Sequence, residues 1–100
     1  MNTIILIRGT NVGSQYEMCK RYADEKGYNV LGVVSNVDRV APLIVNDKID
    51  ILLVSHMSRI TRKYTEYQNI EYMLRGYGIS IEAVIKPKNE MNLKEMLGRG

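Results

Sequence analysis

Short apolar runs alternate along the chain with longer segments in which hydrophobic residues recur at helical spacing. Residues 3–7 form a β-branched, apolar run, which is typical of a strand that is covered on both faces. Similar runs predict strands at residues 28–35, 49–54 and 79–85. Gly32 interrupts the second run and Pro87 follows the last. The pattern therefore predicts four strands.

Helical spacing marks the segment between the first two strands. Met18 and Tyr22 are four residues apart, and so are Cys19 and Ala23, which places each pair on one helix face. Ser14 is expected to cap this helix. Gly27 is expected to end it.

Three further segments predict helices. Residues 37–46 predict a short helix, with Val40, Leu43 and Ile44 facing inward and Pro42 in the first turn. Residues 59–77 predict a long helix with Tyr67 and Tyr77 on its apolar face, and residues 91–97 predict a short amphipathic helix.

Strands that alternate with helices predict a parallel sheet with helices on both faces. The fold class expected from this pattern is a small, open, mostly parallel α/β domain of the flavodoxin-like kind. In such folds, binding sites form at the carboxyl ends of the strands. The residues that follow each predicted strand are therefore the first candidates for a functional site.

Arginines follow three of the predicted strands. Arg8 and Thr10 follow the first, Arg39 follows the second, and Arg59 and Arg62 follow the third. The guanidinium group matches phosphate oxygens, so arginines converging on one edge predict a phosphate site. The net charge is +3, and 10 basic against 11 acidic residues remain without these four arginines. The alternative is that they are ordinary surface residues.

Other functions of this fold class fit the sequence less well. A receiver domain needs acidic residues after the first and third strands, where this chain has Arg8 and Ser55. A flavin or dinucleotide site needs a richer glycine loop than GTNVGS. The single cysteine, Cys19, is expected to be a buried hydrophobic residue. The single histidine, His56, is expected to be structural, with a role as an acid or base beside Thr10 as the alternative.

The order of these residues resembles the catalytic domain of the serine recombinases, the resolvase/invertase family. That family has Arg-x-Ser after the first strand, a glutamine on the first helix, Asp-Arg or similar after the second strand, and Asp-Arg-x-x-Arg after the third. This chain has IRGT, then Gln15, then DR at residues 38–39, then SRITR at residues 58–62 before the long helix and the strand GISI. The segment QYEMCKRYADEKGYNV is also similar, and the resemblance covers about residues 3–85.

The resemblance implies phosphoryl transfer on DNA without a metal or nucleotide cofactor. In the family, a hydroxyl attacks a backbone phosphodiester and forms a protein–phosphate–DNA link, which leaves a free 3′ hydroxyl. Strands are exchanged within a tetramer before the link is reversed. Carried over to this chain, Thr10 takes the nucleophile position and Gln15 orders the loop or the substrate. The implied phosphate clamp, which stabilises the transition state, consists of Arg8, Arg39, Arg59 and Arg62.

Two residues depart from the family pattern. Thr10 stands where the family has serine, and its β-methyl group restricts the side chain and crowds an in-line attack. Ser58 stands where the family has the acidic residue before the first arginine of Arg-x-x-Arg.

The expected organisation is a catalytic domain at residues 1–87, followed at residues 88–100 by a short tail or the start of a longer helix. The expected partner is the DNA backbone, with assembly into a dimer or tetramer. The longest apolar runs are too short to span a bilayer, and the expected location is the cytoplasm. A second hypothesis is a non-catalytic module, derived from a recombinase, that binds DNA, phosphate or a recombinase partner.

Overall fold

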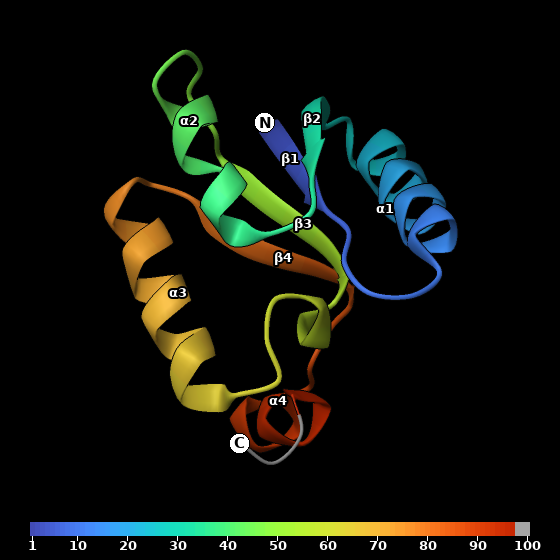
Figure 1. Cartoon of the computed structure of the whole chain (residues 1–100). Helices are drawn as coiled ribbons and strands as arrows, with labels where there is room; N and C mark the ends of the chain where they lie inside the picture. Colours follow the sequence, from blue (N-terminus) through green and yellow to red (C-terminus); the bar gives the residue numbers. More distant parts are fainter. Residues whose placement is uncertain (98–100) are drawn as a thin grey trace.

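The structure, a computed structural model, describes residues 1–97 and has one four-stranded sheet in that range (Figure 1). The strands are β1 (Asn2–Leu6), β2 (Asn29–Val34), β3 (Ile51–His56) and β4 (Ser80–Ile85). They lie in the order β2-β1-β3-β4, and each adjacent pair is parallel. The helices are α1 (Val12–Lys26), α2 (Ala41–Ile44), α3 (Tyr64–Gly76) and α4 (Glu90–Leu97), with short 3-10 turns η1 (Val37–Arg39) and η2 (Met57–Arg59).

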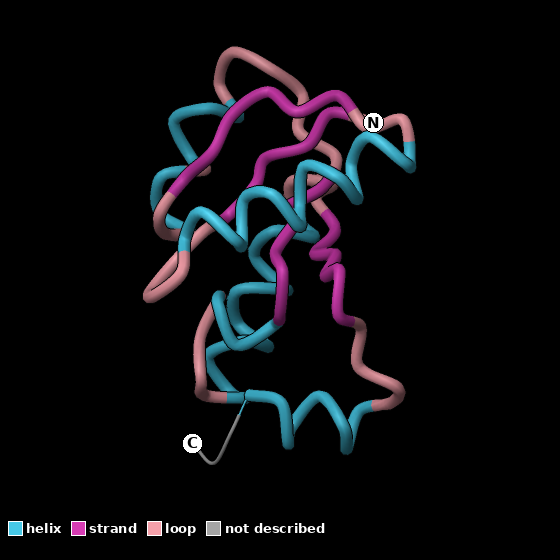
Figure 2. Tube along the Cα trace, turned by 90° about the vertical axis from the view of Figure 1, so that its right-hand side faces the viewer, coloured by secondary structure: helices cyan, strands magenta, loops and turns pink. Residues whose placement is uncertain are grey.

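The predicted parallel α/β fold with helices on both faces is confirmed. In Figure 1, α1 lies on one side of the sheet while α2 and α3 lie on the other. The central strands β1 and β3 are buried along almost their whole length, which explains their continuous apolar runs. In Figure 2, α4 lies at the end of the molecule opposite the N-terminus.

Buried side chains form one group on each face of the sheet. The larger group includes Leu52 of β3 and Leu74 of α3. The smaller group lies under α1 and includes Ile5, Cys19 and Ala23. Burial raises the pKa of the Cys19 thiol to about 11, so the thiol stays protonated at neutral pH. The prediction that Cys19 is a small buried hydrophobic residue is confirmed.

The short helix α4 is attached through Leu97, whose side chain is 0% exposed and belongs to the larger core group. Burying a leucine side chain fully contributes about 1.5–3 kcal/mol. The helix packs against η2, the turn that contains Arg59. Residues that follow the sheet in sequence therefore support one of the candidate site residues.

The predicted long helix at residues 59–77 is wrong in its first turn. Residues 57–59 form η2, and α3 begins only at Tyr64. The Thr61 hydroxyl accepts a hydrogen bond from the Lys63 N–H at 3.2 Å, and such bonds compete with helix formation. Arg59 and Arg62 therefore lie before α3 and not on its first turn.

Three smaller expectations also differ from the structure. Ser14 does not cap α1, because the helix begins at Val12 after Asn11, whose φ is +55°. The predicted helix at residues 37–46 is divided into η1 and α2, with Pro42 in the first turn of α2. Tyr77 is 62% exposed, because α3 ends at Gly76 and turns it away from the core. Gly27 ends α1 as expected, at a φ of +73°.

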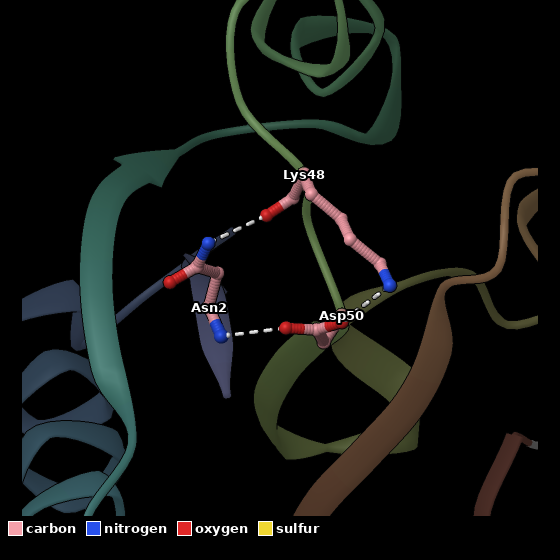
Figure 3. A network of polar contacts seen from close by, with 3 residues as sticks. All are labelled: Asn2, Lys48 and Asp50. Atoms are coloured by element: carbon pink, nitrogen blue, oxygen red, sulfur yellow. Dashed lines mark hydrogen bonds and ion pairs between the residues drawn. The ribbon is translucent and has the colours of Figure 1, made fainter.

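A polar network joins the amino ends of β1 and β3 (Figure 3). The Asn2 backbone N–H donates to Asp50 Oδ2, and the Asn2 side-chain amide donates to the Lys48 carbonyl oxygen, each at 2.8 Å. The Asp50 backbone N–H donates to the Asn2 carbonyl oxygen at 2.8 Å. Lys48 Nζ lies 4.0 Å from Asp50 Oδ1, and this long contact to an exposed lysine contributes little. The network fixes the strand register at the edge opposite the arginine-bearing loops.

Within residues 1–97, no helix has the length and apolar character needed to cross a membrane.

Candidate functional site

A cavity of about 500 Å³ opens at the carboxyl edge of the sheet, between the loops that follow β1 and β3. Its lining comprises Arg8, Gly9, Thr10, Ser58, Arg59, Thr61, Arg62, Lys63 and Glu66. Four of these side chains are basic and one is acidic, which gives the lining a formal charge of +3. An anion such as a phosphate group is the ligand that this lining favours. We call this space the arginine cavity.

Gln15 of α1 holds the loop after β1. Its side chain is 3% exposed. Its Oε1 accepts the Arg8 backbone N–H at 3.0 Å, and its Nε2 donates to the carbonyl oxygens of Arg8 at 2.8 Å and Thr10 at 2.7 Å. One buried amide thus satisfies three backbone groups in a loop that has no strand partner. The sequence suggested that Gln15 orders either the loop or the substrate. Its buried side chain contacts the loop backbone, which is the arrangement expected for ordering the loop.

Arg8 and Arg59 connect the two loops. Arg8 Nη1 donates to the Ile60 carbonyl oxygen at 2.9 Å, and Arg59 Nη1 donates to the Arg8 carbonyl oxygen at 3.3 Å. Gly9 lies between them with a φ of +84°, and a Cβ atom there would be 3.1 Å from Arg59 Nη1. A side chain at position 9 would therefore be strained and would crowd Arg59. These contacts hold the two guanidinium groups in fixed positions.

Thr10 lies on the exposed rim of the arginine cavity. Its carbonyl oxygen is held by Gln15, as described above. Within residues 1–97, its hydroxyl has no hydrogen-bond partner. The hydroxyl is therefore free to meet a ligand, but no neighbouring base activates it in this structure.

Arg39 is the one predicted arginine that does not line the cavity. It is exposed on η1, after β2, and its backbone N–H donates to Asn36 Oδ1 at 3.2 Å. Three of the four arginines expected at this edge are therefore brought together. The role of Arg39 stays a prediction.

His56 and Ser58 form a hydrogen-bonded pair at the end of β3. His56 Nδ1 accepts the Ser58 backbone N–H at 3.1 Å and lies 2.7 Å from Ser58 Oγ. Burial lowers the pKa of His56 below its ordinary value of 6.5, and the nearby charges of Arg59 and Arg62 lower it further. The neutral imidazole is therefore the stable form at neutral pH.

The lowered pKa of His56 makes stability depend on pH. The unfolded chain takes up the proton first as pH falls through about 6.5, so we expect the folded state to lose stability below that value and not above it. One group contributes a slope of at most about 1.4 kcal/mol per pH unit. His56 is the only histidine, which isolates its titration in this range. Urea unfolding at pH 7.5 and 5.5, compared with His56→Asn, measures the effect. An equal loss in both proteins would contradict it.

Three cavity residues were not predicted from the sequence, namely Thr61, Lys63 and Glu66. The apolar spacing predicts a helix over residues 59–77, and a helix would point the side chains of residues 60–63 in different directions. Thr61 was the available signal, because threonine favours turns over helix interiors and leads directly into Arg62 and Lys63.

Three solved structures share this fold across almost the whole chain. The C-terminal catalytic domain of ISC1926 TnpA, an IS607-like serine recombinase, has a TM-score of 0.72 at 21% identity, over 95% of this chain and 76% of that one. The N-terminal catalytic domain of TP901-1 integrase has a TM-score of 0.75 at 16% identity, over 97% and 91%. A resolvase family site-specific recombinase from Streptococcus pneumoniae has a TM-score of 0.73 at 13% identity, over 96% and 83%.

No protein-family model matches the sequence, and neither does any curated protein. At identities of 13–21%, the three structures establish that this chain has the fold of serine recombinase catalytic domains.

Proposed function

We propose that this domain acts in site-specific DNA recombination, by phosphoryl transfer on the DNA backbone through a hydroxyl nucleophile. The observation that carries the proposal is the arginine cavity. Arg8, Arg59 and Arg62 come from two separate strand ends and line a cavity that Thr10 also lines. The same edge belongs to a fold shared with three recombinase catalytic domains.

The proposed roles follow from the contacts. Arg8 and Arg59, fixed by hydrogen bonds to backbone carbonyl groups, neutralise the phosphate and stabilise the charge that develops in the transition state. Arg62 adds a third positive charge from the more exposed side. Gln15 keeps the loop in the shape that presents Thr10. Arg39 is proposed to contact the DNA backbone outside the cavity.

The proposed partner is the DNA backbone, and the proposed assembly is a dimer or tetramer. The proposed catalytic unit is residues 1–87, and α4, which follows it, packs against η2. The resemblance to serine recombinases implies a reaction without a metal or nucleotide cofactor, in which the basic side chains of the cavity neutralise the phosphate.

A non-catalytic phosphate-binding or protein-interaction module is the second candidate. It is favoured by Thr10, whose β-methyl group crowds in-line attack and whose hydroxyl has no base within residues 1–97. Such a module would keep the affinity of the arginine cavity for phosphate without forming a covalent link.

The experiment has a binding stage and a reaction stage. In the binding stage, amide NMR follows a titration with sulfate and then with a short DNA duplex at low salt. We expect shifts to converge on residues 8–10 and 58–63. Scattered or absent shifts would contradict DNA binding by the arginine cavity.

In the reaction stage, Thr10→Ser is incubated with duplexes in which sulfur replaces the 3′ bridging oxygen, because the 3′ thiolate leaves easily. Removing the β-methyl group is expected to raise covalent adduct formation at residue 10 by about ten- to a hundredfold. The matched control is Thr65→Ser, an exposed position on α3 outside the cavity. Binding without any adduct in either protein would favour the non-catalytic module.

A further inference from the structure

Ser58 lies where two cavities meet. It lines the arginine cavity, and it also lines a second cavity of about 370 Å³ between the start of α1 and the end of β3. The second cavity is lined by Asn11, Ser14, Gln15, Met18, Ser55, His56, Ser58, Arg59 and Ile85. Ser58 and Arg59 are the two residues that both linings share. The half-buried Ser58 side chain is therefore open to a ligand that enters from either side.

The hydrogen bonds at His56 define which atom carries the proton. A backbone N–H can only donate, and the Ser58 N–H points at His56 Nδ1 at 3.1 Å. Nδ1 is therefore an unprotonated acceptor, and the Ser58 hydroxyl, 2.7 Å away, donates to the same nitrogen. The two Ser58 donors share the single lone pair of Nδ1, so the imidazole can take the hydroxyl proton once the backbone N–H releases that lone pair.

The surroundings of this pair suit an anionic phosphate. Arg59, the neighbour of Ser58, has a buried Nε–H donor without a partner within residues 1–97. A buried donor of this kind costs stability unless a ligand supplies an acceptor. The charges of Arg59 and Arg62 hold the pKa of His56 down. A bound phosphate would offset those charges and make His56 a stronger base at the moment when one is needed.

We propose that Ser58 is a second nucleophile of this domain, activated by His56, which takes a phosphoryl group from a phosphodiester held by the arginines. The proposal rests on the proposed function in one respect, the binding of phosphate in the arginine cavity. It differs in the attacking atom, because the proposed recombination step uses residue 10.

The step balances with groups on this chain alone. Ser58 Oγ forms a bond to phosphorus, and its proton moves to His56 Nδ1, which gives up the hydrogen bond that it accepts from the Ser58 N–H. The bond between phosphorus and the leaving oxygen breaks, and that oxygen takes the electron pair. A poor leaving group receives the proton from His56, whereas a stable anion such as 4-nitrophenolate leaves without one. The product is a phosphodiester of Ser58.

Ser58 differs from Thr10 in the two properties that favour attack. It lacks the β-methyl group that restricts threonine. Its hydroxyl has a hydrogen-bonded base, which the Thr10 hydroxyl lacks within residues 1–97.

The test uses bis(4-nitrophenyl) phosphate, followed by peptide mass spectrometry to locate the modified residue. Ser58→Ala removes the nucleophile. His56→Asn removes the base but keeps a side-chain oxygen that accepts the Ser58 N–H, so the turn keeps its cap. We expect adduct on Ser58 in the native chain, none at residue 58 in Ser58→Ala, and formation about a hundredfold or more slower in His56→Asn. Ser80→Ala, exposed at the start of β4, is the matched serine control.

The outcomes separate this inference from the proposed function, because sulfate and DNA binding are measured by NMR in the same samples. Adduct on Ser58 that depends on His56 supports the inference, with or without DNA binding. Adduct only on Thr10 overturns it and leaves the proposed function intact. No adduct, or an adduct rate unchanged in a folded His56→Asn, overturns it as well. If the native chain does not bind sulfate, the phosphate-binding step that the two proposals share is overturned.

Discussion

Replacing Gln15 with alanine is expected to destabilise the fold and to release the loop that carries Thr10. Gln15 is 3% exposed and makes three hydrogen bonds to the backbone of Arg8 and Thr10. Leaving those groups without partners is expected to cost about 2–3 kcal/mol. For a domain of this size, that lowers Tm by roughly 10–20 °C. Thermal unfolding followed by circular dichroism measures the change.

The control for this prediction is Gln68→Ala, an exposed glutamine on α3 that makes the same change in helix propensity. NMR spectra of a folded Gln15→Ala protein are expected to show large shifts at residues 8–10, together with weaker sulfate binding. A Gln15→Ala protein as stable as Gln68→Ala, with unchanged loop signals, would show that the buried amide does not hold the loop.

Replacing Arg59 with alanine is expected to have the largest effect on DNA binding. Arg59 lines both cavities, donates to the Arg8 carbonyl oxygen, and has an unpartnered Nε–H within residues 1–97. A hydrogen bond to a charged partner contributes about 1.5–3 kcal/mol. Its loss corresponds to an affinity decrease of roughly 10- to 150-fold. Fluorescence anisotropy with a labelled duplex at low salt measures the change.

Two companion variants define the cause of that loss. Arg21→Ala removes the same charge from an exposed position on α1 that lines neither of these cavities. Arg59→Lys keeps the charge and removes the planar fork. If the fork matters, Arg59→Lys binds almost as weakly as Arg59→Ala, whereas Arg21→Ala stays near the native affinity. Equal losses in Arg21→Ala and Arg59→Ala would mean that only net charge attracts DNA.

The fold could be predicted because its signals are local. Apolar runs such as residues 3–7 and 49–54 are buried on both faces, and this is why they read as central strands of a parallel sheet. Parallel strands bring their carboxyl ends to one edge. That rule alone placed Arg8, Arg59 and Arg62 together, and the structure puts all three around one cavity.

The site's details depended on contacts that the spacing of apolar residues does not reveal. The side chains of Thr61 and His56 accept hydrogen bonds from backbone N–H groups before α3, and α3 begins only at Tyr64 instead of at residue 59. Arg39 follows a predicted strand as the other arginines do, but η1 places it outside the cavity. The position of a residue just after a predicted strand indicates that it lies at the carboxyl edge of the sheet. It does not indicate the direction in which the following loop carries the side chain.

The sequence by itself determined the parallel α/β architecture and the edge at which cationic and hydroxyl groups collect, because both follow from burial and strand direction. The tertiary structure alone decided which hydroxyl has a base. Ser58 meets His56 because β3 ends in a 3-10 turn, whereas Thr10 is held only through its backbone by Gln15. The physical reason is that hydrogen bonds of 2.7–3.1 Å require atoms placed in three dimensions, and only the packing of β3, η2 and α4 places them.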